Sequence, residues 1–533
     1  MRNAVCFAGL LLIALTGSAA GADLKSTLER KLSEVLQEPV TLGRYEVSLN
    51  PPRAVLQDLT IGERVPEAGG RPLAEIEKLT VDYIPSALLV GGPFFSSMRF
   101  EGTRFHVGAD AQGHSNFQRF LQRMLDRKSD DLPGLGELDF AQVTFLFHAP
   151  KPIAAPEGTL TPEPVLVTLD TLKLRSLSAP QTKDQAGPPP APWTEIAFEK
   201  LNIEAPARGN EAPAALLSNG EMLDEGVSAA GGMLELRVHP DRPKLLLVRH
   251  AKLNGLRARS FLPAPGETET FLRIRNTLRA GLLGNAGYVE KGKELSVYVY
   301  DAAAEHAIVD FAGPDPTGRT AYWRLSDLKF QAQQLGFGTL GRSPADRPGF
   351  LTLISPTQSS EGDGFFDLRW NRLADAHPDW SFECDLDVTR LALPALSTRM
   401  GNRGDAGFVR GHLGLRFRGP VRAGRMDLSG SLTVSSDTRL AASSDAERRS
   451  RSLTRVANGQ PIEPIRVTGR LSDPKVELPD YAKHAFAEVM DGIFNNKVTR
   501  FLGNTVEGVG KAAGDAIKRV PILGPLFGGD DDD

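Results

Sequence analysis

Short segments in which apolar and polar residues alternate recur along this chain from about residue 40 to about residue 478. Successive side chains of a β-strand point to opposite faces, so this period of two predicts strands with one apolar and one polar face. Such one-sided strands are typical of antiparallel sheets. The clearest segments are Val55 to Ile61, Leu79 to Tyr83, Val165 to Leu169, Leu295 to Val299, Phe350 to Ile354, Phe366 to Trp370, Phe382 to Val388, Leu413 to Phe417 and Leu428 to Val434. The sequence therefore predicts a mainly β protein.

The length of the chain limits how these strands can be arranged. With 533 residues the chain is too long for one compact hydrophobic core. Roughly twenty strands stacked side by side at about 4.8 Å each would extend on the order of 100 Å. We therefore expect an elongated antiparallel sheet.

Short helices are expected near the N-terminus and at the C-terminus, and helical patterns also occur at Asn116 to Arg127 and at Leu272 to Leu283. Near the N-terminus five apolar residues repeat at helical spacing before Pro39, whose ring ends a helix: Leu24, Leu28, Leu32, Val35 and Leu36. Near the C-terminus another apolar set shares one helical face: Phe486, Met490, Ile493 and Phe494, with Phe501 extending it. This second helix is expected either to dock on the open end of the sheet or to lie in a membrane interface.

Residues 1–22 have the architecture of an export signal. Arg2 precedes an apolar stretch from Ala4 to Leu15, and small residues follow up to Ala20-Gly21-Ala22, which fits the A-x-A cleavage pattern. The apolar stretch is shorter than the roughly 20 residues of a spanning helix. The segment is therefore either a cleaved signal peptide or a weak N-terminal anchor, and both alternatives predict export of the body.

Composition and motifs give little support for catalysis. A net charge of −4 and a pI near 6.2 argue against a nucleic-acid partner. The two cysteines, Cys6 and Cys384, cannot form a disulfide framework, and the nine histidines include no H-E-x-x-H pair. No G-x-S-x-G nucleophile motif occurs. We expect a protein that is not an enzyme, with no catalytic residues, no cofactor and no metal site.

The order of several motifs resembles a known family. Pro39 to Gly62 is followed by Ile76 to Tyr83, by Met98 to Gly102 and by the D-x-x-G-x-x-N turn of Asp110 to Asn116. Near the other end lie Gly411 to Gly419, Leu428 to Val434 and Val467 to Val476. This order is similar to that of AsmA-like proteins, which are exported, membrane-associated proteins of envelope biogenesis. The middle, about 130 to 390, is similar only in being rich in strands.

The resemblance implies an organisation and a function. Behind residues 1–22 it implies an N-terminal helix with strands at 23–128, a central strand-rich sheet at 129–390, C-terminal strands at 391–478, and amphipathic helices with an acidic tail at 479–533. It also implies that the sheet curls into a groove, as in bridge-like lipid-transfer proteins. The expected protein binds or conducts phospholipid or another lipid in the periplasm of a cell with an outer membrane. It associates with a membrane surface, and the resemblance names no protein partner.

Clean alternation supplies the candidate groove residues. They are Leu79, Val81, Tyr83, Leu295, Val297, Val299, Leu413, Leu415 and Phe417. The alternative is that these apolar faces pack against each other as ordinary sandwich cores. In that case the protein is a scaffold of stacked β-sandwiches that binds protein or glycan partners. The two alternatives differ in whether the apolar faces line one open channel or form separate closed cores.

Overall fold

The fold is known from a computed structural model of the chain. It describes residues 21–36, 38–62, 64–65, 68–83, 95–109, 115–117, 119–120, 137–148, 153–155, 158–160, 164–177, 193–204, 215–216, 222–223, 226–239, 242–261, 277–278, 296–315, 317, 319–337, 349–372, 382–397, 408–422, 425–440, 458–470, 473–480 and 482. The predicted export signal up to Ala20 and the predicted C-terminal helix lie outside these residues.

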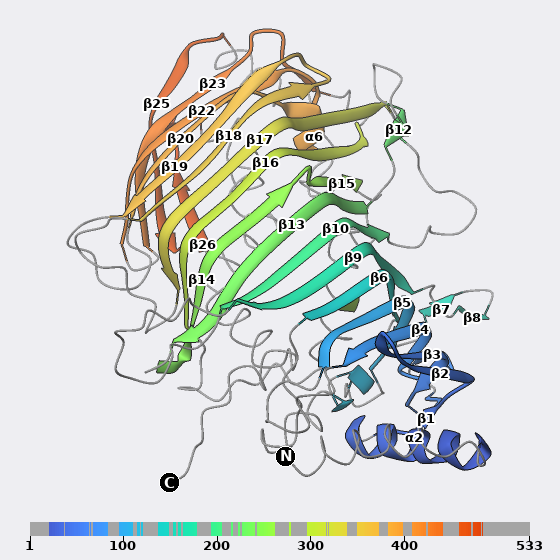
Figure 1. Ribbon diagram of the computed structural model, residues 1–533. Coiled ribbons are helices and arrows are strands. Elements are labelled where there is room, and N and C mark those ends of the chain that lie inside the picture. Colours follow the sequence, from blue (N-terminus) through green and yellow to red (C-terminus); the bar gives the residue numbers. More distant parts are fainter. Residues whose placement is uncertain are drawn as a thin grey trace, which may run out of the picture.

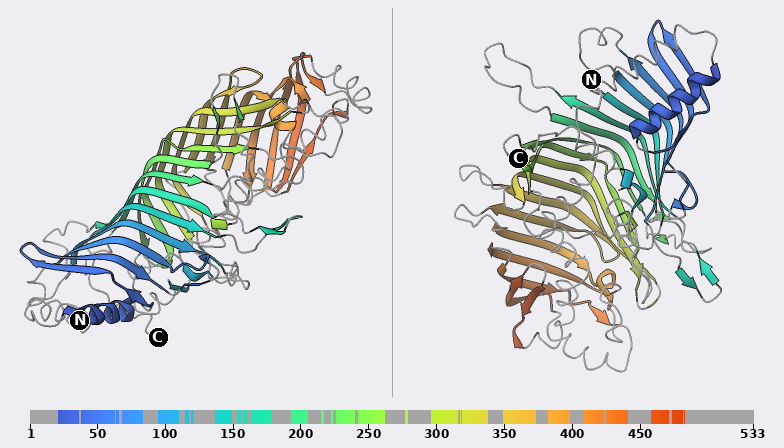
Figure 2. Two further views of the ribbon diagram at one scale, coloured as in Figure 1. Left: turned by 90° about the vertical axis from the view of Figure 1, so that its right-hand side faces the viewer. Right: turned by 90° about the horizontal axis from the view of Figure 1, so that it is seen from below.

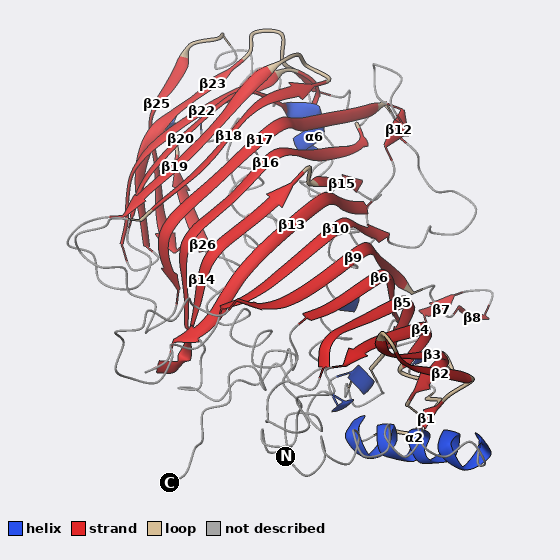
Figure 3. Cartoon of the chain, viewed as in Figure 1, coloured by secondary structure: helices blue, strands red, loops and turns tan. Residues whose placement is uncertain are grey.

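One long helix begins the described chain, and strands make up most of the rest (Figure 3). The helices are α2 (Gly21–Leu36) and the short α6 (Leu393–Ser397). The strands of the first half are β1 (Val40–Thr41), β2 (Arg44–Leu49), β3 (Pro52–Ile61), β4 (Ala74–Tyr83), β5 (Phe95–Val107), β6 (Glu137–Phe147), β7 (Ile153–Ala155), β8 (Gly158–Leu160), β9 (Val165–Leu177), β10 (Trp193–Glu204), β11 (Ala215–Leu216), β12 (Met222–Leu223), β13 (Gly226–His239), β14 (Arg242–Asn254) and β15 (Arg257–Phe261). Those of the second half are β16 (Ser296–Pro314), β17 (Thr320–Phe337), β18 (Phe350–Ser359), β19 (Gly364–Arg372), β20 (Phe382–Ala392), β21 (Phe408–Arg410), β22 (His412–Arg422), β23 (Arg425–Val434), β24 (Arg439–Leu440), β25 (Pro461–Arg470) and β26 (Asp473–Glu477).

Twenty of these strands form one continuous sheet whose order largely follows the chain (Figure 1). Each long strand pairs with the next long strand, from β3 with β4 through to β25 with β26. The pairing is antiparallel except where β6 follows β5 and where β16 follows β14 and β15. The predicted mainly β fold with an elongated, curled, mostly antiparallel sheet is confirmed. Among the described residues, the last strand of the chain, β26, ends at Glu477.

The two faces of this sheet differ in character along its length. Cross-strand pairs keep like residues together: Leu353 faces Leu368, which faces Leu386 on the next strand. The neighbouring row carries charges, since Asp367 faces Asp387. Because a slip of one residue would place charges among apolar side chains, this pattern fixes the register. We call the two sides the apolar face and the polar face.

The apolar face is the inside of the curl. Trp323 of β17 packs against the core built by β20, β22, β23 and β25, and against Ala392 and Ala395. Two strands, β18 and β19, lie between β17 and β20 in the sheet. Strands that are not neighbours therefore meet across the apolar face, as the curvature in Figure 2 also shows.

Irregularities within the strands account for part of this curvature. Six non-glycine residues with positive φ lie inside long strands, and the strand pairing skips each of them: Asp58, Gln142, Lys200, His306, Gln334 and Arg390. At His306 and Arg390 the register shifts, so these two residues lie at β-bulges, which bend a strand and increase its twist. The register is the same on both sides of the other four residues, where the irregularity is confined to the backbone of one residue. The bulges favour a strongly curled sheet over a flat one.

The polar face carries cross-strand ion pairs. Arg53 Nε lies 2.6 Å from Asp82 Oδ1 near one end, and Arg466 lies 2.9 Å from Asp427 near the other. In between, Lys200 Nζ lies 2.6 Å from Asp170 Oδ2. Exposed pairs of this kind contribute at most about 1 kcal/mol each, so their main effect is on register and solubility.

The predicted domain limits do not divide this sheet. The limit at 390/391 falls inside β20, and the limit at 128/129 falls outside the described residues. The helix predicted before Pro39 is present as α2, which ends at Leu36. Among the described residues, no helix is both long and apolar enough to cross a membrane.

Candidate functional site

The N-terminal end of the apolar face is covered by α2. Leu28 of this helix is 5% exposed and packs in a cluster with Leu56, Leu59 and Ile76 of β3 and β4. Two hydrogen bonds hold the helix to the chain that follows: Val40 N donates to Ser33 Oγ at 2.8 Å, and Leu42 N donates to Glu29 Oε1 at 2.9 Å. The amphipathic helix thus closes this end of the apolar face.

The C-terminal end is closed more completely. Side chains of β22, β23 and β25 form one buried cluster with Leu393 of α6: Leu413, Phe417, Leu432, Val434, Ile465 and Val467 are each 0% exposed. Phe417 faces Gly430 across the β22–β23 pair, and a Cβ at Gly430 would lie 2.7 Å from the phenyl ring. The missing side chain leaves the space that the ring fills.

The middle of the apolar face is different. Several of its large apolar side chains are only partly buried: Ile196 and Phe198 on β10, Leu234 on β13, Leu253 on β14, Val299 on β16, Phe330 on β17, and Leu351 and Leu353 on β18. Others on the same strands are buried, namely Leu236, Val248, Leu325 and Leu328. Pairing places the partly buried side chains in one band, since Ile196 faces Leu234 and Phe330 faces Leu353. We call this band the open middle, and it is the candidate functional site.

Small residues line part of the open middle. Ala251, Ala302 and Ala332 are aligned across β14, β16 and β17. Ala332 is 2% exposed, whereas Ala251 and Ala302 are partly buried. A methyl group fills less space above the sheet than a larger apolar side chain would. The arrangement can accommodate an apolar ligand by contact alone.

The predicted groove residues divide into two groups. Leu79 and Val81 are 7% and 5% exposed in the cluster beneath α2. Leu413, Leu415 and Phe417 are 0%, 4% and 0% exposed in the C-terminal cluster. At these five positions the apolar face is a closed core, so the groove interpretation does not hold there. The reason is that α2 and the curled C-terminal strands pack onto the face.

Val299 lies in the open middle, and its neighbours Tyr298 and Tyr300 lie on the polar face, as the alternation predicted. Val297 and Tyr83 lie in β16 and β4, but their side chains are outside the description. Leu295 lies outside the described residues, as do the predicted C-terminal helix residues Phe486, Met490, Ile493, Phe494 and Phe501.

The sequence prediction missed most residues of the open middle, and a backbone irregularity at Lys200 explains part of this. On β10 the apolar positions are even before Lys200, at Ile196 and Phe198, and odd after it, at Leu201 and Ile203. Lys200 has a positive φ and is skipped by both neighbouring strands. A search for unbroken alternation therefore rejects this strand. A pattern that allows one change between even and odd apolar positions within a strand would have identified β10.

The titratable groups on this face do not form a reactive site. Cys384 is 6% exposed in the C-terminal core, where burial raises the pKa of its thiol to about 12. The thiol is therefore protonated at neutral pH and is a poor nucleophile. Among the residues that the structure describes, no group of three or more His, Cys, Asp or Glu side chains is placed to hold a metal ion.

The fold and this site define a class: a single curled sheet, closed at both ends of its apolar face and partly open between them. No protein-family model matches the chain, and no curated protein matches it either. The case for a function therefore rests on the geometry and on the order of the sequence motifs.

Proposed function

We propose that this protein is a non-enzymatic envelope-biogenesis protein that binds or conducts lipid along the apolar face of its sheet. The observation that carries the proposal is the open middle, where large apolar side chains on consecutive strands remain partly exposed. Neighbouring apolar side chains that stay partly exposed favour a binding site. An acyl chain is the ligand that needs only such contacts.

The dimensions of the open middle suit an acyl chain. From β10 to β18 the strands follow one another as β10, β13, β14, β16, β17 and β18. The spacings between these strands, at about 4.8 Å each, give a band of about 24 Å. One leaflet of a bilayer contributes half of a hydrocarbon core that is about 30 Å thick. A lipid tail can therefore lie along the band without leaving it.

The energetic need for such a band is large. Each methylene transferred from water to an apolar surface contributes about 0.8 kcal/mol, so an unprotected two-chain lipid faces a barrier on the order of tens of kcal/mol. A band of apolar side chains lowers this barrier without any catalytic group. This fits a chain in which no catalytic motif was found.

The sequence supports the cellular setting of this proposal. The export signal pattern of residues 1–22 and the resemblance to AsmA-like proteins suggest the periplasm of a cell with an outer membrane. The amphipathic pattern from Phe486 to Phe501 suggests contact with a membrane surface. One continuous sheet of long strands favours the proposal over the alternative, a scaffold of stacked β-sandwiches.

Site-specific photo-cross-linking tests the proposal. A benzophenone amino acid at Phe198 or Val299 should capture lipid in cells, which mass spectrometry of the purified adduct would identify. The same amino acid at Lys252, an exposed position of β14 on the polar face, is the matched control and should capture none. Equal labelling at Phe198 and Lys252, or no lipid at Phe198 and Val299, would contradict lipid binding in the open middle.

A further inference from the structure

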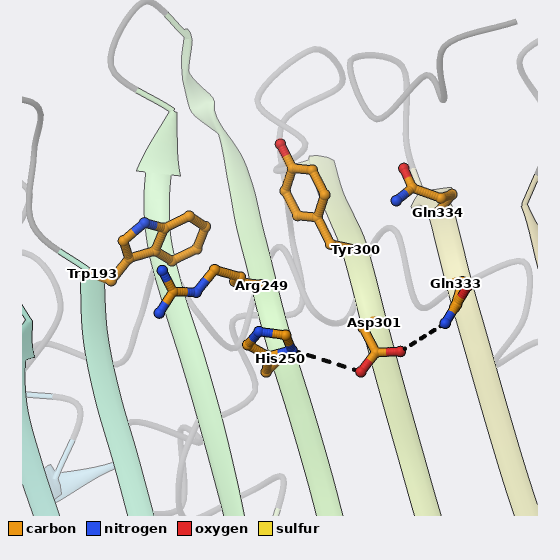
Figure 4. A pocket seen from close by; sticks show the side chains of 7 residues that line it. All are labelled: Trp193, Arg249, His250, Tyr300, Asp301, Gln333 and Gln334. Atoms are coloured by element: carbon orange, nitrogen blue, oxygen red, sulfur yellow. Dashed lines mark hydrogen bonds and ion pairs between the residues drawn. The ribbon is translucent and has the colours of Figure 1, made fainter. Parts of the chain in front are cut away.

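A pocket of about 420 Å³ lies on the polar face, on the opposite side of the sheet from the open middle (Figure 4). Its volume falls within the range of about 300–1,000 Å³ that is usual for small-ligand sites. The lining residues are Trp193, Arg249, His250, Tyr300, Asp301, Gln333 and Gln334. They come from β10, β14, β16 and β17.

The pocket exists because three strands are irregular at the same level. Consecutive residues of a regular strand point to opposite faces, yet the pairs Arg249–His250, Tyr300–Asp301 and Gln333–Gln334 all line this pocket. The β13–β14 register shifts at this level, and Gln334 has a φ of 54°. Where the alternation is interrupted, two consecutive side chains lie on the same face, and a regular strand would place only one of them there.

One wall of the pocket is aromatic and rests on buried side chains. Tyr300 is 39% exposed, and its ring lies 4.8 Å from the ring of Tyr298 in an edge-to-face contact. Tyr298 is 5% exposed and packs with Leu245 and Leu247. Its hydroxyl is also hydrogen-bonded to Gln334. The support is rigid, so the Tyr300 ring presents a defined flat surface to a ligand.

The second aromatic ring is held by arginines. The guanidinium groups of Arg237 and Arg249 lie 4.4 Å and 5.0 Å from the centre of the Trp193 ring. Cation–π contacts at these distances orient the indole.

The charges in the pocket are already compensated. Arg249 lies 2.5 Å from Glu235, and His250 Nδ1 lies 3.6 Å from Asp301. The amide of Gln333 donates to Asp301 at 3.2 Å. Because Arg249 already has a carboxylate partner and Asp301 adds a carboxylate to the lining, an anionic ligand gains little here. A neutral ligand with many hydroxyl groups gains more, since a carboxylate accepts hydrogen bonds from hydroxyls and amide groups both donate to and accept from them.

We infer that this pocket binds a neutral carbohydrate. The Tyr300 ring offers a flat apolar surface for the C–H face of a sugar ring, and Asp301, Gln333 and Gln334 offer fork-shaped polar groups for adjacent hydroxyls. The inference does not depend on lipid binding, because the pocket and the open middle lie on opposite faces of the sheet. A protein with both sites would bind lipid on its inner side and a glycan on its outer side.

Saturation-transfer NMR on the full-length protein tests the inference with defined probes. These are cellotetraose, chitotetraose and maltotetraose as neutral glycans, and inorganic phosphate as an anion, each at about 1–10 mM to reveal weak binding. We expect at least one neutral glycan to bind, and Tyr300→Ala to weaken it about three- to tenfold, as the loss of one aromatic contact predicts. Asp301→Asn should also weaken it.

Phe365→Ala is the matched control, because Phe365 is a 40% exposed aromatic residue at another place in the sheet. It should bind the glycan like the unchanged protein, and all variants should keep the thermal unfolding temperature of the unchanged protein within a few degrees. Binding of phosphate without any neutral glycan would overturn the inference. So would the absence of binding by the folded protein, or glycan binding that Tyr300→Ala and Phe365→Ala affect equally.

Discussion

The closed C-terminal end and the open middle of the apolar face have the same kind of sequence pattern but different surroundings. In β22 the alternating residues Leu413, Leu415 and Phe417 are almost completely buried. In β10 the residues Ile196 and Phe198 are equally apolar and remain partly exposed. Alternation therefore reports that a face is apolar, and it does not report whether another part of the chain covers that face.

Side-chain size accounts for part of the difference. The C-terminal end combines branched aliphatic residues with Phe417, which fills the space above Gly430. The middle has the alanine row of Ala251, Ala302 and Ala332. Large side chains interdigitate and exclude solvent, whereas a row of methyl groups fills less of the space above the sheet.

The largest expected effect is a charge in the closed C-terminal end. Leu415→Asp should prevent folding or destabilise the protein by more than about 4 kcal/mol, because the 4% exposed position gives an unpaired carboxylate neither water nor a partner. Urea unfolding followed by circular dichroism measures this. Arg416→Ala, at the exposed neighbouring position, is the control and should change stability by less than about 1 kcal/mol. A stable Leu415→Asp variant would show that this end is open as well.

A smaller effect is expected at the helix that covers the other end. Leu28→Ala should cost about 2–4 kcal/mol of local stability, since it removes the most buried contact of α2 with β3 and β4. Hydrogen exchange should then become faster in β3 and β4 and stay unchanged in β22. Arg30→Ala on the exposed side of α2 is the control. If exchange in β3 and β4 is unaffected by Leu28→Ala, the helix does not protect that end.

In the open middle, a charge should impair binding more than folding. Val299→Asp should cost only about 1 kcal/mol, because a partly exposed carboxylate stays partly hydrated, while the lipid that copurifies with the protein should fall strongly. Thermal unfolding and lipid mass spectrometry on one sample separate the two effects. Loss of folding comparable to that of Leu415→Asp would mean that the middle is a closed core like the C-terminal end.

Two histidines near the closed N-terminal end give a weaker, pH-dependent effect. The rings of His106 and His148 lie 6.1 Å apart, and burial lowers the pKa of both. The nearby carboxylate of Glu75 partly offsets this lowering of the pKa of His106. The charge of His106 lowers the pKa of His148 further. The unfolded chain therefore binds protons more readily than the folded chain. The two histidines do not reduce the free energy of unfolding above about pH 6.5, and they reduce it as the pH drops below that value. Urea unfolding across this window should show a shallower decline for His148→Gln than for the unchanged protein. The side chain of His306 is 77% exposed, so His306→Gln should not change how the free energy of unfolding declines with pH.

The smallest expected effect concerns Cys384. In a Cys6→Ser variant, the one remaining thiol should not react with a disulfide reagent in the folded protein, because burial keeps it protonated and inaccessible. It should react fully after unfolding in urea. Rapid reaction without denaturant would mean that solvent enters the C-terminal core.

Much of the local structure could be predicted from the sequence. The helix before Pro39, the strands up to Glu477 and the opposite faces of Val299 and Tyr298 all follow from short-range periodicity. The candidate site was predicted less well. Five of the nine groove candidates lie in closed cores, because the cleanest alternation marks the strands with the most complete packing. The pocket at Trp193 and Tyr300 was missed, because a register shift at β14 and a positive φ at Gln334 of β17 interrupt the alternation at this level.

By itself, the sequence determined that this chain forms one-sided strands over most of its length, because alternation of side chains is a property of neighbouring residues. Only the tertiary structure decided where the apolar face is closed, by bringing Leu28 onto β3 and β4, and Trp323 onto strands that are not its neighbours. The tertiary structure also decided which side chains share the pocket on the polar face. Burial depends on contacts between residues far apart in the chain, and a single bulge reverses the parity that a local pattern assumes.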